Sequence, residues 1–347
     1  MSSRVLPLVR AALLATCSAL ASCSGDSGDA APADACTPAR TTAAALCHFT
    51  EYAGNPVLAP PGEPITGDPS VLPPEASPDG RWHLFAWVFA GIVHYASPDG
   101  IAWTEVDRPF KIGSVRPYVF RDGGQYHLVF ERFSQIAPPQ VSHIQIADSP
   151  DLVTWSEPVT ILEASLDWEK ETQSTVGNPY IVARDGEYWL YYSASGVSLP
   201  DAGYTEPRYI GLARSGSLRG PYVKEPKPIV SPDPAVPWRN LGSGSLKLLG
   251  DRYGGKWVAL ENGIYKDGAG ATHSAIQVIE SDDGVSWHDA CPSPPLAPTG
   301  AGWNKAFVYA FDTVRRGAEV RVYYNARDGW MDGVERIGFS STTLTCR

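Results

Sequence analysis

The stretch SPDGIAW, Ser97–Trp103, decides the fold because the chain repeats it. Near-copies stand at Ser149–Trp155 (SPDLVTW) and Ser281–Trp287 (SDDGVSW), a degenerate copy, SGSLRGPY, begins at Ser215, and the chain ends with SSTTLTC from Ser340. The first serines of successive copies lie about 50–66 residues apart. Internal repeats of roughly this length are typical of β-propellers, in which each repeat forms one blade.

The segments before each copy indicate β-structure. They contain the aromatic-rich runs GRWHLFAWV, GQYHLVFER, GEYWLYYSA, GKWVALEN and AEVRVYYNA. Alternating apolar residues bounded by glycine-containing turns predict strands. The chain divides into five such units of about four strands, and one unit alone cannot bury both of its faces. The sequence therefore predicts an all-β, five-bladed β-propeller over residues 47–347.

The repeated aspartate and tryptophan have structural roles in this interpretation. The side chain of Asp99, and of its equivalents, is expected to accept backbone N–H bonds and to hold the turn between the third and fourth strands. Trp103 and its equivalents are expected to cover the gap between neighbouring blades. We assign no chemistry to the repeated motif.

The two ends of the domain are predicted to meet. The segment Tyr52–Pro60 resembles the residues that come after the tryptophan in other repeats, so it should supply the missing strand of the fifth blade and close the ring. Four cysteines, Cys36, Cys47, Cys291 and Cys346, come after the N-terminal segment that is interpreted below as an export signal. An even number of cysteines in an exported protein favours two disulfides. We expect Cys47 to pair with Cys346 and Cys36 with Cys291; the alternative is Cys36 with Cys47 and Cys291 with Cys346.

The N-terminus has the features of an export signal. Arg4 and Arg10 flank an apolar run that is too short and interrupted for a membrane span. It ends in LASC, Leu20–Cys23, which resembles the lipobox of bacterial lipoproteins. Residues 1–23 are therefore predicted to be a signal peptide with lipid on Cys23, or an ordinary secretory signal, and residues 24–46 a flexible tether.

Net charge restricts the partners. The formal charge of −10 and the lack of a basic cluster exclude a nucleic-acid partner. We expect a monomer in the bacterial cell envelope, at the outer membrane or cell surface, or a secreted protein. It would contact a membrane only through the lipid anchor.

The motifs that open the blades resemble those of a known family. Over residues 50–347 the chain resembles the five-bladed propeller enzymes of glycoside hydrolase family 43. The resemblance is carried by the segments NPVLAP and GDPSVL, RPYVF, GNPYIV with DGEYWLYYSA, ARSGSLRGPY, and YYNARDGW. This family includes arabinanases, arabinofuranosidases and β-xylosidases. The resemblance implies a general base on blade one, a second aspartate on blade three and a glutamate acid on blade four. Asp68 fits the role of the base. Asn178 stands where the aspartate of blade three is implied, and Ser243 or Ser245 stands where the glutamate of blade four is implied.

The acid must then come from another carboxylate, or the protein does not hydrolyse glycosides. Glycoside hydrolysis needs two carboxyl groups across one bond, one of them protonated. Strand ends at the predicted funnel face carry Glu131, Glu171, Glu206, Glu261 and Glu335. We rank Glu261 first and Glu131 second, because apolar strand residues precede both and favour burial. Each of these side chains alone could instead be a solvated loop carboxylate.

Other residues on this face suggest how a ligand is held. Its arginines would suit a carboxylated or phosphorylated sugar, or they pair with the glutamates. Tryptophans that precede first strands would stack on sugar rings, or pack between blades. The predicted substrate-binding residues are Arg116, Arg132, Glu171, Asn178, Arg208, Ser243, Trp303 and Arg327. No histidine or cysteine spacing indicates a metal site, and no cofactor is expected beyond the structural calcium seen in relatives.

The sequence thus predicts an exported glycoside hydrolase, acting on a furanoside such as an arabinoside, with Asp68 activating water and Glu261 or Glu131 as acid. The alternative is a non-catalytic, glycan-binding surface lipoprotein with a propeller fold.

Overall fold

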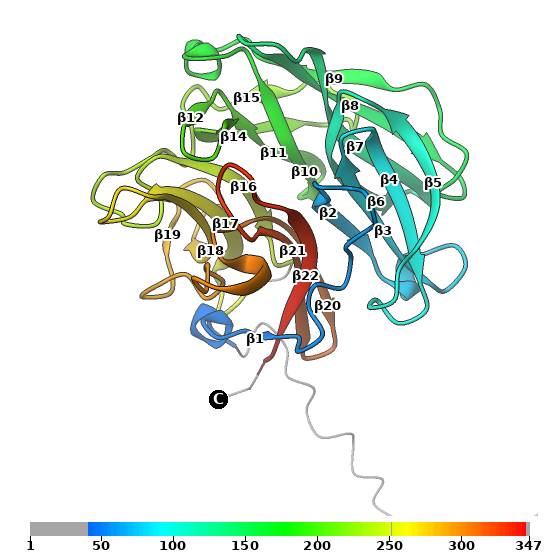
Figure 1. Ribbon diagram of the computed structural model, residues 1–347. Helices are drawn as coiled ribbons and strands as arrows, with labels where there is room; N and C mark the ends of the chain where they lie inside the picture. Colours follow the sequence, from blue (N-terminus) through cyan, green and yellow to red (C-terminus); the bar gives the residue numbers. More distant parts are fainter. Residues whose placement is uncertain (1–40, 251, 345–347) are drawn as a thin grey trace, which may run out of the picture. The chain divides into compact units, whose positions relative to one another are not determined.

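The computed structural model describes residues 41–250 and 252–344. Its regular structure consists of β-strands and short 3₁₀ helices, and no α-helix occurs in this part of the chain (Figure 1). The all-β prediction is therefore confirmed. No helix within the described ranges has the length and hydrophobicity of a membrane span. The short helices are η2 (Ala43–Leu46), η3 (Pro74–Ala76), η4 (Asp167–Lys170) and η5 (Gly302–Asn304).

Apart from one two-stranded hairpin, the described strands form five antiparallel sets of four, which follow one another in chain order except that β1 belongs to the last set (Figure 1). The first set is β2 (Gly67–Leu72), β3 (Trp82–Val88), β4 (Gly91–Ser97) and β5 (Thr104–Lys111). The second is β6 (Ser114–Asp122), β7 (Gln125–Gln135), β8 (Val141–Ser149) and β9 (Val159–Glu163). The third is β10 (Val176–Arg184), β11 (Glu187–Ala194), β14 (Tyr209–Ser215) and β15 (Val223–Lys224).

The fourth and fifth sets complete the domain. The fourth is β16 (Gly242–Leu248), β17 (Trp257–Lys266), β18 (Thr272–Ser281) and β19 (His288–Asp289). The fifth is β20 (Phe307–Arg316), β21 (Glu319–Arg327), β22 (Glu335–Thr343) and β1 (Thr50–Glu51). A single parallel pair, Ser274 with Phe307, links the two sets. The first strands β2, β6, β10, β16 and β20 contact one another in this order, and β20 also contacts β2.

The repeated aspartates hold their turns as predicted. One carboxylate oxygen of Asp99 accepts the backbone N–H groups of Ile101 at 2.8 Å and Ala102 at 2.9 Å. Asp151 and Asp283 accept the equivalent pairs of N–H groups in their own turns. These bonds favour the charged carboxylate, and they lower the pKa of Asp99.

The repeated tryptophans pack across the boundaries between sets. The ring of Trp103, after the first set's third strand, lies edge-on to Tyr323 of β21, with 6.1 Å between centroids. The ring of Trp155 in the second set meets Phe85 of β3 at 5.8 Å. The repeated motif therefore packs one set of strands against a neighbouring set, as expected.

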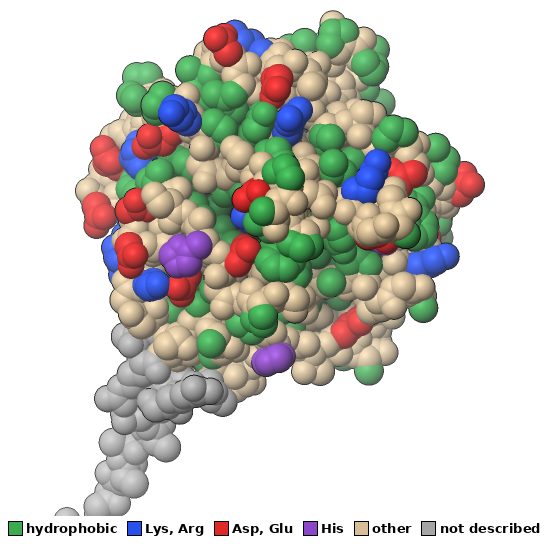
Figure 2. Space-filling view, turned by 90° about the vertical axis from the view of Figure 1, so that its left-hand side faces the viewer, with side chains coloured by type: hydrophobic (Ala, Val, Ile, Leu, Met, Phe, Trp, Pro, Cys, Tyr) green, Lys and Arg blue, Asp and Glu red, His purple; other side chains and the backbone are tan. Residues whose placement is uncertain are grey.

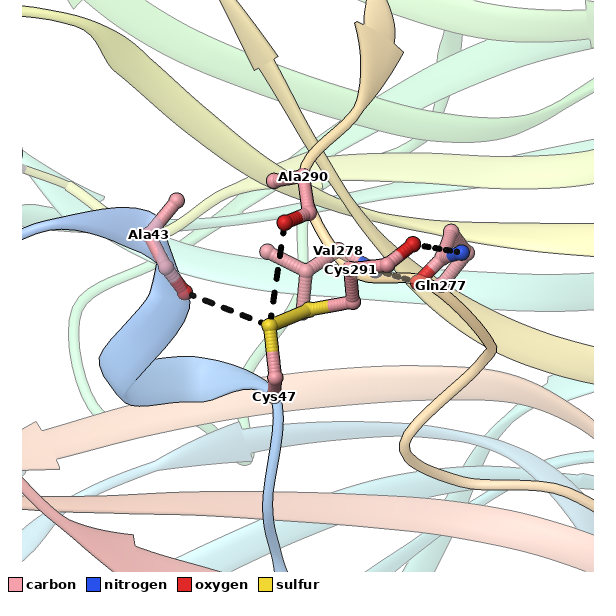
Figure 3. The surroundings of a disulfide bond; sticks show 6 residues. All are labelled: Ala43, Cys47, Gln277, Val278, Ala290 and Cys291. Atoms are coloured by element: carbon pink, nitrogen blue, oxygen red, sulfur yellow. Dashed lines mark hydrogen bonds between the residues drawn. A yellow bond between two sulfur atoms is a disulfide. The ribbon is translucent and has the colours of Figure 1, made fainter.

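The disulfide pairing predicted from the sequence is wrong. Cys47 is bonded to Cys291 (Figure 3), which excludes Cys47–Cys346, Cys36–Cys291 and both bridges of the alternative. The reason is that η2 packs against the fourth set, where its Ala43 and Leu46 join a buried cluster with Cys291. Cys47, directly after η2, is thereby held next to Cys291.

The tether prediction is also corrected at its C-terminal end, because residues 43–46 form η2 and contribute to the core. The signal-peptide segment 1–23, Cys23, Cys36 and Cys346 lie outside the described residues. On the face shown in Figure 2, acidic and basic side chains are interspersed and do not gather into a basic patch.

Candidate active site

The first strands of the five sets share one irregularity that creates a set of equivalent positions. The pairing of each first strand with the second skips two residues at the same place, a β-bulge that re-aims side chains. The skipped positions that correspond to one another are Asp68, Arg116, Asn178, Gly244 and Tyr309. The place where the resemblance implies the acid is thus occupied by Gly244, between Ser243 and Ser245.

Three of these residues have a left-handed backbone. The φ angles of Asp68, Arg116 and Asn178 are 52°, 54° and 45°, and a proline follows each of them. Such values are costly for residues other than glycine, and they recur at functional sites. The backbone N–H of Asp68 donates to the side-chain oxygen of Asn325 at 3.2 Å, which ties this turn to β21.

The equivalent positions open into a cavity of about 600 Å³. Asp68, Arg116 and Asn178 reach it from first strands, and Arg327 reaches it from the end of β21. Three further carboxyl groups line the same cavity, those of Glu206, Glu335 and Asp332, and burial raises the pKa of the first two. Glu335 opens β22, and Glu206 ends the hairpin formed by β12 (Val197–Leu199) and β13 (Tyr204–Glu206), an insertion between the second and third strands of the third set.

Burial shapes the acidity of Asp68. Removal of its carboxyl group from water raises its pKa to about 6, although the positive charge of Arg116 opposes the rise. Asp68 is therefore mostly ionised at neutral pH. An ionised carboxylate in a cavity can accept a proton from water, as a general base must.

Glu206 is the most weakly acidic of the three. Burial raises its pKa to about 8, and the negative charges of Asp68 and Glu335 add to the rise. The Nη2 atom of Arg116 lies 3.7 Å from Oε2 of Glu206 and limits the shift. Glu206 is mostly protonated at neutral pH and can donate a proton.

Glu335 lies between these extremes. Burial raises its pKa to about 7, against the attraction of Arg327, whose Nη1 lies 3.7 Å from Oε1 of Glu335. The side-chain amide of Asn325 donates to Glu335 at 3.4 Å. Because Asn325 also accepts the bond from Asp68, it links Asp68 to Glu335.

Glu131 lies in a second cavity, of about 370 Å³, which shares Asp68 and Arg116 with the first. The Glu131 side chain is buried, and its Oε2 accepts a bond of 2.7 Å from Nη1 of Arg116. The carboxylate also lies against Gly177 so closely that a Cβ there would come within 1.8 Å of Oε2. Only glycine fits at this position.

The structure does not support the first rank given to Glu261. Its carboxylate is buried but lines neither cavity. Ser243 donates to Oε1 of Glu261 at 2.5 Å, and Arg239 donates to Oε2 at 3.2 Å. These two neighbours close over the carboxylate, so burial here reflects an internal ion pair.

The predicted binding residues divide in two. Arg116, Asn178 and Arg327 line the first cavity. The others line neither cavity and are occupied in other ways: Arg132 donates to the Ile112 carbonyl, Glu171 accepts from Tyr209 and lies 3.9 Å from Arg208, Ser243 binds Glu261, and Trp303 stacks on Tyr324.

Sequence reasoning selected Glu206 and Glu335 as funnel residues but did not rank them. Their positions in the cavity depend on the β12–β13 hairpin and on the residue at which β22 begins. The repeated sequence motif predicts neither of these features. The described residues hold no group of three or more His, Cys, Asp or Glu side chains placed to bind a metal.

Comparison with known proteins confirms the family resemblance. The family profile "Glycosyl hydrolases family 43" matches residues 106–223, about a third of the chain. No curated protein matches this chain. A solved structure of a thermostable family-43 glycoside hydrolase is similar with a TM-score of 0.58 and 13% identity, covering 81% of this chain and 91% of that one.

Two further structures share the fold. An N-acetylgalactosamine deacetylase from F. plautii, in complex with blood group B trisaccharide, has a TM-score of 0.60 and 15% identity, covering 85% of this chain and 93% of its own. An exo-1,5-α-L-arabinanase from a bovine ruminal metagenomic library has a TM-score of 0.55 and 12% identity, covering 79% and 92%. At these identities the likeness concerns the fold.

Proposed function

We propose that this chain is a glycoside hydrolase in which Asp68 is the general base and Glu206 the general acid. One observation carries the proposal: the two carboxyl groups line one cavity, and their pKa values are raised to about 6 and about 8. Such a separation assigns one group to the ionised role and the other to the protonated role at neutral pH.

The chemistry balances with these two groups. Glu206 gives its proton to the glycosidic oxygen as the bond between that oxygen and the anomeric carbon breaks. A water molecule forms the new bond to the anomeric carbon, and Asp68 takes the proton that the water loses. Attack from the face opposite the leaving group would invert the configuration, as the family resemblance implies.

Arg116 and Glu335 support this division. Arg116 favours the charged form of Asp68 and thereby opposes its protonation at neutral pH. The negative charge of Glu335 raises the pKa of Glu206, which favours the protonated form of Glu206. Both act on the reacting groups through charge and are positioning residues here.

The proposed ring of blades rests on the same resemblance, and the proposed location rests on the N-terminal sequence and the disulfide. We propose that the five sets of strands are the blades of a propeller closed by β1, because neighbouring first strands contact one another and β1 pairs with β22. We further propose a monomeric exported protein with lipid on Cys23. Its disulfide suits an oxidising compartment outside the cytoplasm. An arabinofuranoside is the proposed substrate class, after the resemblance to arabinanases.

A glycan-binding protein without catalysis remains the second candidate. It is favoured by Asn178 and Gly244, which stand where the resemblance implies carboxylates. In that case the same cavity would bind a sugar, and the raised pKa values would have no catalytic consequence.

The test is hydrolysis of a panel of aryl glycosides, including α-L-arabinofuranosides, and of plant and mycobacterial polysaccharides. Asp68→Asn and Glu206→Gln should each lose activity on polysaccharide by about 10²-fold or more. Matched controls are Asp185→Asn, at an exposed position whose φ of 48° resembles that of Asp68, and Glu187→Gln on the exposed start of β11. Sugar binding by calorimetry without hydrolysis by the parent would establish the second candidate.

A further inference from the structure

The second cavity differs in chemistry from the first. Around its mouth stand three of the large hydrophobic side chains that are most exposed in the described structure: Phe89 at 57%, Ile112 at 63% and Ile136 at 54%. Trp87 and Phe133 line it further in. Exposed apolar groups that converge on one hollow mark a binding surface, whereas scattered ones do not.

This apolar cavity is continuous with the proposed site. Asp68, Trp87, Phe89, Arg116 and Thr205 line both cavities. Glu206 lines the first, while its chain neighbours Thr205 and Pro207 line the second. The acid and the base thus stand where the two cavities meet.

The Glu131 side chain, which lines the second cavity, has one buried oxygen without a hydrogen-bond partner among the described residues. The Glu131 side chain is fully buried and pairs with Arg116 through Oε2, while its Oε1 has no hydrogen-bond partner among the described residues. A buried carboxylate oxygen without a partner is costly unless a ligand or water donates to it. Glu131 therefore adds one polar group to the wall of a cavity that is otherwise mainly apolar.

From this junction we propose that the second cavity receives the leaving group of the glycoside, and that this group is a hydrophobic alcohol or phenol. The sugar would occupy the more polar first cavity, with the scissile oxygen beside Glu206. After cleavage, the leaving oxygen carries the proton from Glu206 and becomes the hydroxyl of the released alcohol. The inference rests on the proposed function for the cleavage step, but the binding preference can be tested without it.

The experiment compares methyl, n-butyl and n-hexyl glycosides of one sugar, an α-L-arabinofuranoside or whichever sugar the aryl panel identifies. These leaving groups have similar acidity, so differences in kcat/KM report binding of the alkyl chain. A fully buried methylene is worth about fourfold, so kcat/KM should rise about tenfold or more from methyl to butyl.

The double variant Ile112→Thr, Ile136→Thr should lose most of that rise, measured as the ratio of kcat/KM for the butyl glycoside to kcat/KM for the methyl glycoside. Both side chains are exposed and lie outside the strands, so the variant should fold. The matched control is Val159→Thr, Val223→Thr, which replaces exposed apolar residues at 43% and 76% on β9 and β15, outside both cavities. It should keep the full preference.

The outcomes separate the two proposals. Hydrolysis of all three glycosides at equal kcat/KM would overturn the leaving-group inference and leave the hydrolase proposal standing. If no glycoside is cleaved, the hydrolase proposal fails, and calorimetric titration with the methyl and butyl glycosides then decides the inference. Tighter binding of the butyl compound that the double variant abolishes would support an apolar subsite, and equal binding would overturn it.

Discussion

The Nη2 atom of Arg116 lies 3.7 Å from Oε2 of Glu206, while Nη1 of the same guanidinium lies 2.7 Å from Oε2 of Glu131. One cation therefore serves a carboxylate in each cavity. Its charge opposes the rise in pKa that burial imposes on Glu206 and on Asp68. The acidity of both Asp68 and Glu206 therefore depends on this one side chain.

The first prediction concerns the pH dependence of kcat/KM. Activity should fall below about pH 6, as Asp68 becomes protonated, and above about pH 8, as Glu206 loses its proton. In the double variant Arg116→Gln, Glu131→Gln, which keeps a neutral pair, the limb due to Glu206 should move to higher pH by about 1–3 units, the effect of losing one nearby charge. Glu131→Gln alone is the control and should leave that limb in place.

The second prediction distinguishes an acid from a binding group. Glu206→Gln should lose about 10²–10⁴-fold on a natural oligosaccharide, whose alkoxide leaving group needs a proton. On a dinitrophenyl glycoside the loss should be small, because the phenolate leaves without protonation. Initial rates on both substrates give the comparison. Equal losses would show that Glu206 binds substrate and does not protonate it.

The third prediction is that the same substitution stabilises the protein at alkaline pH. Because the folded-state pKa of Glu206 is raised from 4.5 to about 8, the folded state binds more protons than the unfolded state between these values. The free energy of unfolding contributed by Glu206 is therefore largest below about pH 4.5 and is lost as pH rises towards 8. Gln does not titrate and avoids this loss.

Urea unfolding should show Glu206→Gln gaining on the parent by a few kcal/mol between pH 4.5 and pH 8.5, with about 4 kcal/mol as the upper limit, since one pKa unit is worth about 1.4 kcal/mol. Glu187→Gln should show no such pH-dependent gain. A constant difference across this range would mean that Glu206 is not buried as described.

The fourth prediction concerns the repeated turn. Asp99→Ala removes the acceptor of two backbone N–H groups and should cost about 1–2 kcal/mol of the free energy of unfolding. Activity per folded molecule should stay the same, because Asp99 lines neither cavity. Asp99→Asn keeps an acceptor oxygen and should cost less. An unchanged midpoint for the alanine variant would contradict the structural role of the motif.

The fifth prediction concerns the bridge between Cys47 and Cys291, which are 244 residues apart in sequence. Replacing both by alanine should lower the free energy of unfolding by about 2–5 kcal/mol, because without this cross-link the unfolded chain gains conformational entropy. Peptide mapping without reduction should find Cys47 joined to Cys291. A peptide that joins Cys47 to Cys346 would refute the pairing.

The strands were predictable because each copy of the sequence repeat contains the same series of strand segments and turns. The GDP, VRP and GNP triplets stand at equivalent places, so Asp68, Arg116 and Asn178 could be placed at one site from the sequence. The proline after each residue and the β-bulge then give the same geometry three times.

The proposed acid, Glu206, was not predictable in the same way. Glu261 and Glu131 both follow apolar strand residues, and both are buried, but only Glu131 lines a cavity. The difference arises from Ser243 and Arg239, which close over Glu261 through contacts with no sequence signal. Glu206 depends on a hairpin that interrupts the repeat, so periodicity could not rank it.

The pairing of β1 with β22 has a consequence for how the chain must be made. Thr50 pairs with Ser341, so the first described strand waits for almost the last to be synthesised before its partner exists. Contacts of such long sequence separation close late and slow folding. During that interval β22's neighbours present an unpaired edge, which invites association with other chains. The fold therefore cannot be completed until β22 has been synthesised and has paired with β1.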